Sequence, residues 1–228
     1  MFKTKIQIPA ALASILLLAG GCAATDASDG TKKTDYTKMS PQELADHLIL
    51  ETDSFNLSQE TQEGGTARDR MVQDELQKMC SETRNRPTAE QAAKIIADAR
   101  ASIQYPEGGI PLGDWKNGES LAWGGFGFRI AHNPDDHSAR EPSGNCYNCH
   151  AMSPQRTGGD LGPSLTGYGI TRGDNEATRR FVYEMIYNPH AYFPCTNMPR
   201  MGAKGLLSKE AIADIMAYML HPDSPVNK

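Results

Sequence analysis

The sequence is poor in aromatic side chains, has fewer bases than acids and, beyond its first residues, has no long apolar run. Only 7% of its 228 residues are aromatic, and 23 Lys and Arg residues stand against 28 Asp and Glu residues. Without a basic excess the chain lacks the positive surface of a typical nucleic-acid binder. No stretch after the start is apolar for long enough to cross a bilayer. The content of 39% hydrophobic and 22% charged residues excludes a disordered, collagen-like or coiled-coil chain.

The five cysteines are too few for a disulfide-stapled miniprotein, and their odd number requires an explanation. Cys22 follows a short basic start and a mostly apolar run from Ile6 to Leu18. This layout predicts a secretory signal peptide over residues 1–24, because the run is too short for a membrane anchor. Cys22 is then either the lipidated first residue of a lipoprotein, with the signal ending at residue 21, or a residue lost by cleavage. Both alternatives predict export to the periplasm, and a membrane association only if Cys22 is lipidated.

The exported chain shows three regions, and none of them has a strand pattern or an internal repeat. Residues 25–39 are polar and predict a flexible leader. Residues 40–104 predict a helical N-terminal extension, and residues 105–228 predict a loop-rich domain with three helices. The expected fold class is therefore all-α. Helices are expected over 41–51, 66–82, 89–103, 114–123, 175–188 and 209–221.

Helix-start signals support several of these assignments. Ser40 with Glu43, and Thr88 with Gln91, form capping-box patterns that predict the beginnings of two helices. Asp174 is expected to cap the helix that ends before Asn188. Long Gly- and Pro-rich loops between helices are uncommon in a compact domain and usually indicate function.

The motif Cys146-Tyr-Asn-Cys149-His150 is C-x-x-C-H, the attachment site of a c-type haem. The two thiols add to the porphyrin vinyl groups, and the histidine binds the iron as the proximal ligand. A thioredoxin-like dithiol is the first alternative, but that motif belongs beside a βαβ pattern, which is missing here. Zinc is the second, but the sequence lacks a matching second pair of ligands. The sequence therefore predicts one covalently bound haem c at Cys146 and Cys149, with His150 on the iron.

A second axial ligand is predicted at Met198, in a loop and directly before Pro199. A thioether is a soft ligand that favours ferrous iron and raises the reduction potential. Met201, Met152 and His190 are the alternatives, and a methionine is also a common core filler.

These residues resemble the class I cytochrome c family. The resemblance rests on Cys146–His150, on Leu161-Gly-Pro-Ser-Leu165, on Asn197-Met-Pro199 and on the terminal helix with Ala217-Tyr218. It implies a class I cytochrome c-like haem domain. It also implies that the carbonyl of Pro163 accepts a hydrogen bond from the ring of His150, a contact that orients a metal-bound imidazole.

Longer blocks resemble one branch of that family, SoxX, the monohaem subunit of the sulfur-oxidising SoxAX complex. The blocks are residues 105–119, 144–150, 162–172, 195–202 and 221–228. The resemblance implies a heterodimer with a SoxA-like c-type cytochrome, a SoxYZ-like sulfur carrier and a downstream electron-acceptor cytochrome. It implies the electron-transfer subunit of an L-cysteine S-thiosulfotransferase, with no catalytic residue on this chain and the sulfur chemistry on the partner.

Two cysteines and one arginine remain to be assigned. In an oxidising compartment Cys80 and Cys195 are expected to form a disulfide, the alternative being two buried unpaired thiols. Arg172 is a candidate partner for a haem propionate, or an exposed loop cation. Two other functions compete with the SoxX prediction: a free-standing class I cytochrome c electron shuttle, and a haem-free thiol oxidoreductase that uses Cys146 and Cys149.

Overall fold

The computed structural model describes residues 34–61, 65–127 and 139–228. The predicted signal peptide with Cys22, and most of the predicted leader 25–39, lie outside the described residues. The chain divides into two compact units, residues 1–35 and residues 36–228. Everything described below belongs to the second unit.

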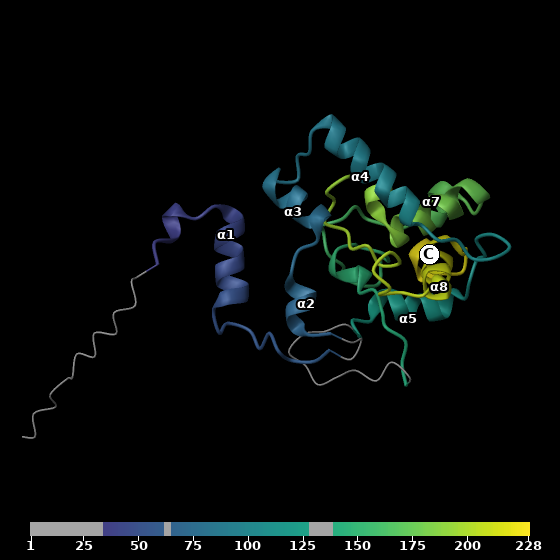
Figure 1. Cartoon of the computed structure of the whole chain (residues 1–228). Helices are drawn as coiled ribbons and strands as arrows, with labels where there is room; N and C mark the ends of the chain where they lie inside the picture. The colour runs from purple at the N-terminus through teal and green to yellow at the C-terminus, as the bar shows by residue number, and fades with distance from the viewer. Residues whose placement is uncertain (1–33, 62–64, 128–138) are drawn as a thin grey trace, which may run out of the picture. The chain divides into compact units, whose positions relative to one another are not determined.

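The described part of this unit is helical and contains no β-strand, which confirms the all-α prediction (Figure 1). Short 3-10 or π segments (η) accompany the α-helices. The elements are η1 (Tyr36–Lys38), α1 (Pro41–Asp46), η2 (His47–Glu51), α2 (Ala67–Met71), α3 (Glu75–Glu82), α4 (Ala89–Ser102), α5 (Trp115–Trp123), η3 (Cys146–Asn148), α6 (Tyr168–Arg172), α7 (Glu176–Tyr187), η4 (Pro189–Ala191), α8 (Lys209–Leu220) and η5 (Pro225–Asn227).

The two predicted capping boxes are confirmed at the starts of α1 and α4. At α1 the Ser40 hydroxyl accepts from the N–H of Glu43, whose carboxylate accepts from the N–H of Ser40. Thr88 and Gln91 make the same reciprocal pair at α4. Each box satisfies two backbone donors that a helix start leaves without partners.

The predicted single helix over 66–82 is wrong, because non-helical residues separate α2 from α3. Val72 has extended backbone angles, and Asp74 then caps α3 by accepting from the N–H of Gln77. A capping box inside a helical pattern favours a second start over continuation. The predicted cap of α7 is also displaced by one residue, since Asn175 accepts from the N–H of Thr178.

Helix α6 was missed because it is short and its cap carries no side-chain signal. It begins after Gly167, which has a positive φ of 71°. Its first N–H groups are satisfied from far along the chain, by the side chain of Asn227, which accepts from the N–H groups of Gly169 and Ile170. The amide of Asn227 also donates to the carbonyl of Met219, so the last residues hold α6 against the end of α8.

The core forms around α8, which is buried along almost its whole length. Helices α5, α6 and α7 all pack against it, α5 most extensively. The closest approach is at Gly118 of α5, where an added Cβ would lie 1.9 Å from the carbonyl oxygen of Asp214 in α8. This crossing therefore requires a residue without a side chain. None of the helices in the described part is long and apolar enough to cross a membrane.

Candidate functional site

The Cys-x-x-Cys-His motif lies on η3, between α5 and α6. The turn starts after Asn145, whose φ of 49° is in the left-handed region. The N–H groups of Cys149 and His150 both donate to the carbonyl of Cys146, at 3.1 and 3.0 Å. Cys146 and Cys149 are both unpaired. One turn of chain therefore presents two thiols and an imidazole.

The imidazole of His150 is held by the segment 161–165. Its Nδ1 lies 2.7 Å from the carbonyl oxygen of Pro163. A carbonyl only accepts, so Nδ1 carries the proton and donates, and Nε2 keeps its lone pair. The resemblance to class I cytochromes predicted this contact, and the sequence pattern by itself did not.

Gly162 lies directly against the same ring. A Cβ added there would lie 2.2 Å from Cε1 of His150, and the N–H of Gly162 donates to the carbonyl of Cys149 at 2.8 Å. The ring is thus confined by backbone on one side and fixed by a hydrogen bond at Nδ1. Both contacts leave Nε2 as the atom available to a ligand.

Tyr147, between the two cysteines, anchors the turn in the core. Its hydroxyl lies 2.7 Å from the hydroxyl of Tyr218 in α8, and its ring meets the ring of Trp123 edge-on at 4.4 Å between centroids. Trp123 is itself exposed, and the guanidinium of Arg156 lies over its ring. Tyr147 was not among the predicted site residues, although its place inside the motif was a signal that could have identified it.

Burial raises the pKa of the Cys146 thiol to about 12. The thiol packs against the core, where a charged sulfur is poorly solvated. Reactive cysteines work as thiolates and therefore have lowered pKa values. These surroundings disfavour a thiolate at Cys146.

Met198 lies in the loop between η4 and α8 and is half-buried against the core, as is Met201. The other two alternative axial ligands, Met152 and His190, already have roles in the folded chain. Met152 is fully buried as core filler. Burial lowers the pKa of His190, whose neutral Nδ1 accepts from the N–H of Cys195 at 3.1 Å. Arg172 is exposed at the end of α6, and its carbonyl accepts from Thr178.

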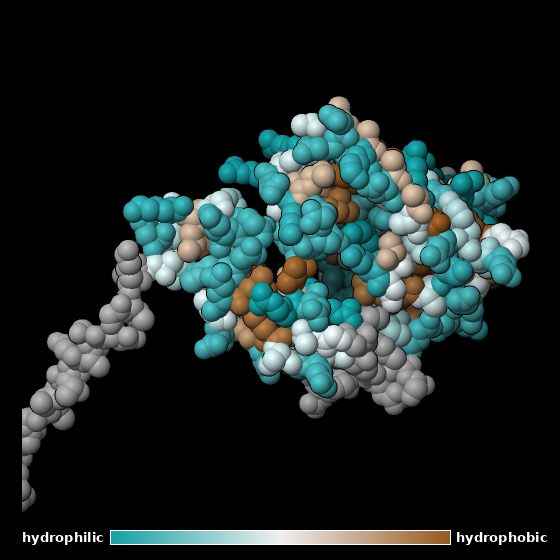
Figure 2. All heavy atoms as spheres, viewed as in Figure 1, coloured by the Kyte–Doolittle hydropathy of each residue, from teal (hydrophilic) through white to brown (hydrophobic). Residues whose placement is uncertain are grey.

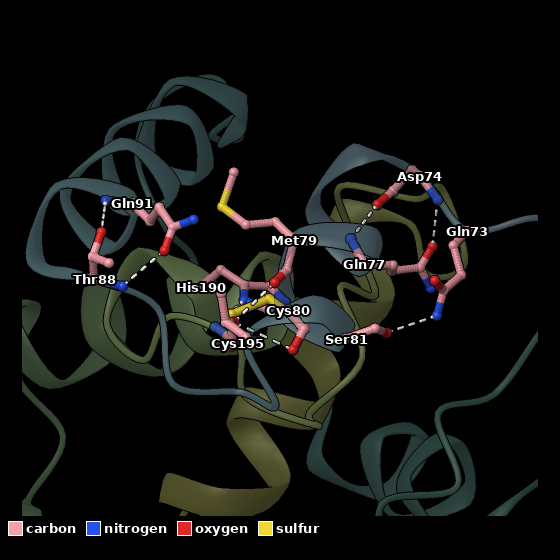
Figure 3. The surroundings of a disulfide bond; sticks show 11 residues. Gln73, Asp74, Gln77, Met79, Cys80, Ser81, Thr88, Gln91, His190 and Cys195 are labelled. Atoms are coloured by element: carbon pink, nitrogen blue, oxygen red, sulfur yellow. Dashed lines mark hydrogen bonds between the residues drawn. A yellow bond between two sulfur atoms is a disulfide. The ribbon is translucent and has the colours of Figure 1, made fainter. Parts of the chain in front are cut away.

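A disulfide joins Cys80 of α3 to Cys195, at the start of the loop that carries Met198 (Figure 3). Both cysteines are buried, with Ile95, Leu76 and Met79 around them. Figure 3 shows the ring of His190 beside the two sulfur atoms. This Cys80–Cys195 disulfide is the one predicted for an oxidising compartment.

Asp74, the residue that caps α3, binds the same loop beyond Met198. Its carboxylate lies 2.8 Å from the guanidinium of Arg200 and 2.8 Å from the ammonium of Lys204. Partial burial opposes the charge of Asp74, but hydrogen bonds from Lys204, Gln77 and Arg200 outweigh it and hold the pKa of the carboxyl well below its usual range. Asp74 was not among the predicted site residues, although Asp74-x-x-Gln77 is a readable capping pattern.

The face drawn in Figure 2 is hollowed, and hydrophobic residues gather around the hollow. A separate surface pocket of about 540 Å³ lies between the loop after α4 and the start of α7, lined by Tyr105, Ile110, Arg179 and neighbours.

No three His, Cys, Asp or Glu side chains in the described segments lie close enough together to hold a metal ion.

A search of curated proteins found a protein of Aquifex aeolicus (strain VF5) described as an uncharacterized lipoprotein. It is 42% identical to this chain over 159 residues, which cover 69% of this chain and 74% of the relative. The chain belongs to the family of this lipoprotein. The match is longer than the predicted domain 105–228, so the lipoprotein family shares part of the N-terminal extension as well. No family model matches the chain.

The assignment to the SoxX branch is wrong on this finding. A SoxX protein should match sulfur-oxidation cytochromes, whereas the chain matches a lipoprotein with no assigned activity. The resemblance to SoxX rested on short Gly- and Pro-rich blocks, which cover only a small part of the chain. The SoxA-like and SoxYZ-like partners and the thiosulfotransferase role were implied by that branch alone, and they stay predictions that no finding tests.

Proposed function

We propose that this protein is an exported monohaem c-type cytochrome with a class I cytochrome c-like domain, and that it transfers electrons. The observation that carries the proposal is the geometry of His150. Its Nδ1 donates to the carbonyl of Pro163, so that Nε2 is left to bind iron, and two unpaired thiols precede it on the same turn. C-x-x-C-H with such an oriented histidine is the arrangement of c-type haem proteins.

The residues present fit haem c. Cys146 and Cys149 would hold the porphyrin covalently, and His150 and the thioether of Met198 supply a nitrogen and a soft sulfur ligand. Gly162 leaves no side chain beside the imidazole. When bound, haem supplies a one-electron iron couple.

The chain's own groups adjust that couple. The hydrogen bond to Pro163 fixes the tautomer of His150 and makes Nε2 more basic. A thioether at Met198 stabilises the reduced metal and raises the potential. The dithiol alternative is disfavoured by the raised pKa of Cys146.

Replacing Cys146 and Cys149 together by alanine is expected to abolish covalent haem completely, because no other unpaired cysteine lies in the described part of the chain. The protein is made in cells that attach c-type haem. Intact mass and the alkaline pyridine spectrum then report attachment. Asn148→Ala, which changes an exposed residue between the two cysteines and leaves the motif intact, is the control and should keep its haem. A wild-type protein without the c-type band would contradict the proposed function.

We also propose that a lipid on Cys22 anchors the chain to a membrane. A relative that shares most of this chain is described as a lipoprotein, and Leu18-Ala-Gly-Gly precedes Cys22. Residues 25–35, which precede the folded unit in the sequence, would then separate the anchor from it.

Cys22→Ser is therefore expected to move the protein from the membrane fraction to the soluble periplasmic fraction. Fractionation and labelling with palmitate measure the two effects. A matched change at Ser28, six residues on, should leave both unchanged. Wild-type protein that is soluble and unlabelled would contradict the anchor without touching the haem proposal.

A further inference from the structure

Helix α3 contacts the Met198 loop on both sides of the methionine. On one side the disulfide fixes Cys195, three residues before Met198. On the other, Asp74 binds Arg200, two residues after it, and Lys204. Asp74 caps the start of α3, and Cys80 lies towards its end, so both links come from one short helix.

The disulfide side of this contact is buried and well packed. The N–H of Cys195 donates to Nδ1 of His190 at 3.1 Å, and Cys195 holds a positive φ of 58°. Ile95 of α4 packs against the disulfide. The start of the loop is therefore fixed by a covalent bond, a hydrogen bond and apolar contacts.

The ionic side is partly shielded from water. The side chain of Arg200 is 14% exposed and that of Asp74 is 33% exposed. The carboxylate of Asp74 accepts from Arg200, from Lys204 and from the N–H of Gln77. A charge pair of this kind, held by several hydrogen bonds, is stronger than an exposed pair.

Apart from its packing against the core, Met198 has few constraints of its own. It lies outside any helix, and its N–H makes one long hydrogen bond, 3.3 Å, to the hydroxyl of Thr196. An unrestrained methionine loses side-chain entropy when it binds iron, and a loop held at both ends has already lost part of that freedom.

We propose that Asp74 and Cys80 are positioning residues that hold Met198 in place as the axial ligand. The proposal rests on the proposed function, because it gives the N-terminal extension a role at the haem iron. Loosening either link increases the fraction of molecules in which Met198 has left the iron.

The test uses full-length holoprotein and added imidazole, which binds iron only where Met198 has left. Because apparent affinity scales with the competent fraction, Asp74→Asn is expected to bind imidazole about 10-fold more tightly than wild type. Asn still caps α3, so the variant removes the charge and keeps the helix start. Asp74→Glu restores the charge and should return the affinity towards wild type. Asp98→Asn, which removes an exposed pair with Lys94 in α4, is the control and should change nothing.

A second readout does not depend on haem. Hydrogen exchange of the amides of residues 196–204, apart from Pro199, should become faster in Asp74→Asn and stay unchanged in Asp98→Asn. The positioning role alone would be overturned if wild type carries haem and Asp74→Asn has the same imidazole affinity and the same exchange rates as wild type. A wild-type chain that carries no haem would overturn the proposed function, and the role of Met198 with it.

Discussion

Replacing Cys80 and Cys195 together by alanine will lower the free energy of unfolding by about 4 kcal/mol. The two residues are 115 positions apart, so the bond closes most of the folded unit into one loop. Without the bond the unfolded chain has a much larger conformational entropy, which favours unfolding. Both sulfurs are also buried, which adds a small loss of packing.

Urea unfolding followed by circular dichroism, with the variant and the wild type at one pH, measures this change. Wild type treated with a dithiol reductant should approach the variant. Glu82→Gln, which changes an exposed residue near Cys80 on α3, should stay within about 0.5 kcal/mol of wild type. Equal stabilities of the wild type and the double variant would contradict the entropic role of the bond.

Gly118→Val will destabilise the protein by about 3 kcal/mol. A Cβ at this position meets the backbone of α8, at 1.9 Å from the carbonyl oxygen and 2.4 Å from the carbonyl carbon of Asp214. Neither atom belongs to a side chain that could rotate away. The helices α5 and α8 must move apart, and their shared core loses contacts along the crossing.

The comparison with Gly118→Ala makes the test sharper. In an exposed helix interior, replacing glycine by alanine would stabilise by roughly 0.5–1 kcal/mol. Here the same change should destabilise, because the methyl group has no room. Ser120→Ala, at an exposed position of α5, is the matched control. A stabilising Gly118→Ala would show that α5 and α8 do not approach each other as described.

The elements that could be predicted are those whose signals lie close together in the sequence. The boxes Ser40–Glu43 and Thr88–Gln91 identified two helix starts, and they reach over only three residues. The break at Asp74 was missed because the apolar pattern on either side continued through it. Helix α6 was missed because Asn227, nearly sixty residues away, supplies its cap.

The site divides in the same way. The spacing of Cys146, Cys149 and His150 predicts a haem site, which stays a proposal, and the place of Pro163 came from the family resemblance. The ion pairs of Asp74 join residues 126 and 130 positions apart. The local sequence shows Asp74 as a helix cap, but it does not show Arg200 and Lys204 as its partners. Contacts over such separations follow from the packing of the whole unit.

The disulfide is also non-consecutive, which bears on how the chain matures. Cys80 pairs with Cys195, and Cys146 and Cys149 lie between them in the sequence. Four thiols allow three complete pairings, and in a chain that leaves the export channel from its N-terminus Cys146 is the first partner to reach Cys80. The native bond therefore forms if Cys80 stays reduced until Cys195 is available, if the two middle thiols are occupied first, or if a wrong bond is reshuffled. The order in which the cysteines react is thus a part of the biosynthesis of this protein that its covalent connectivity already imposes.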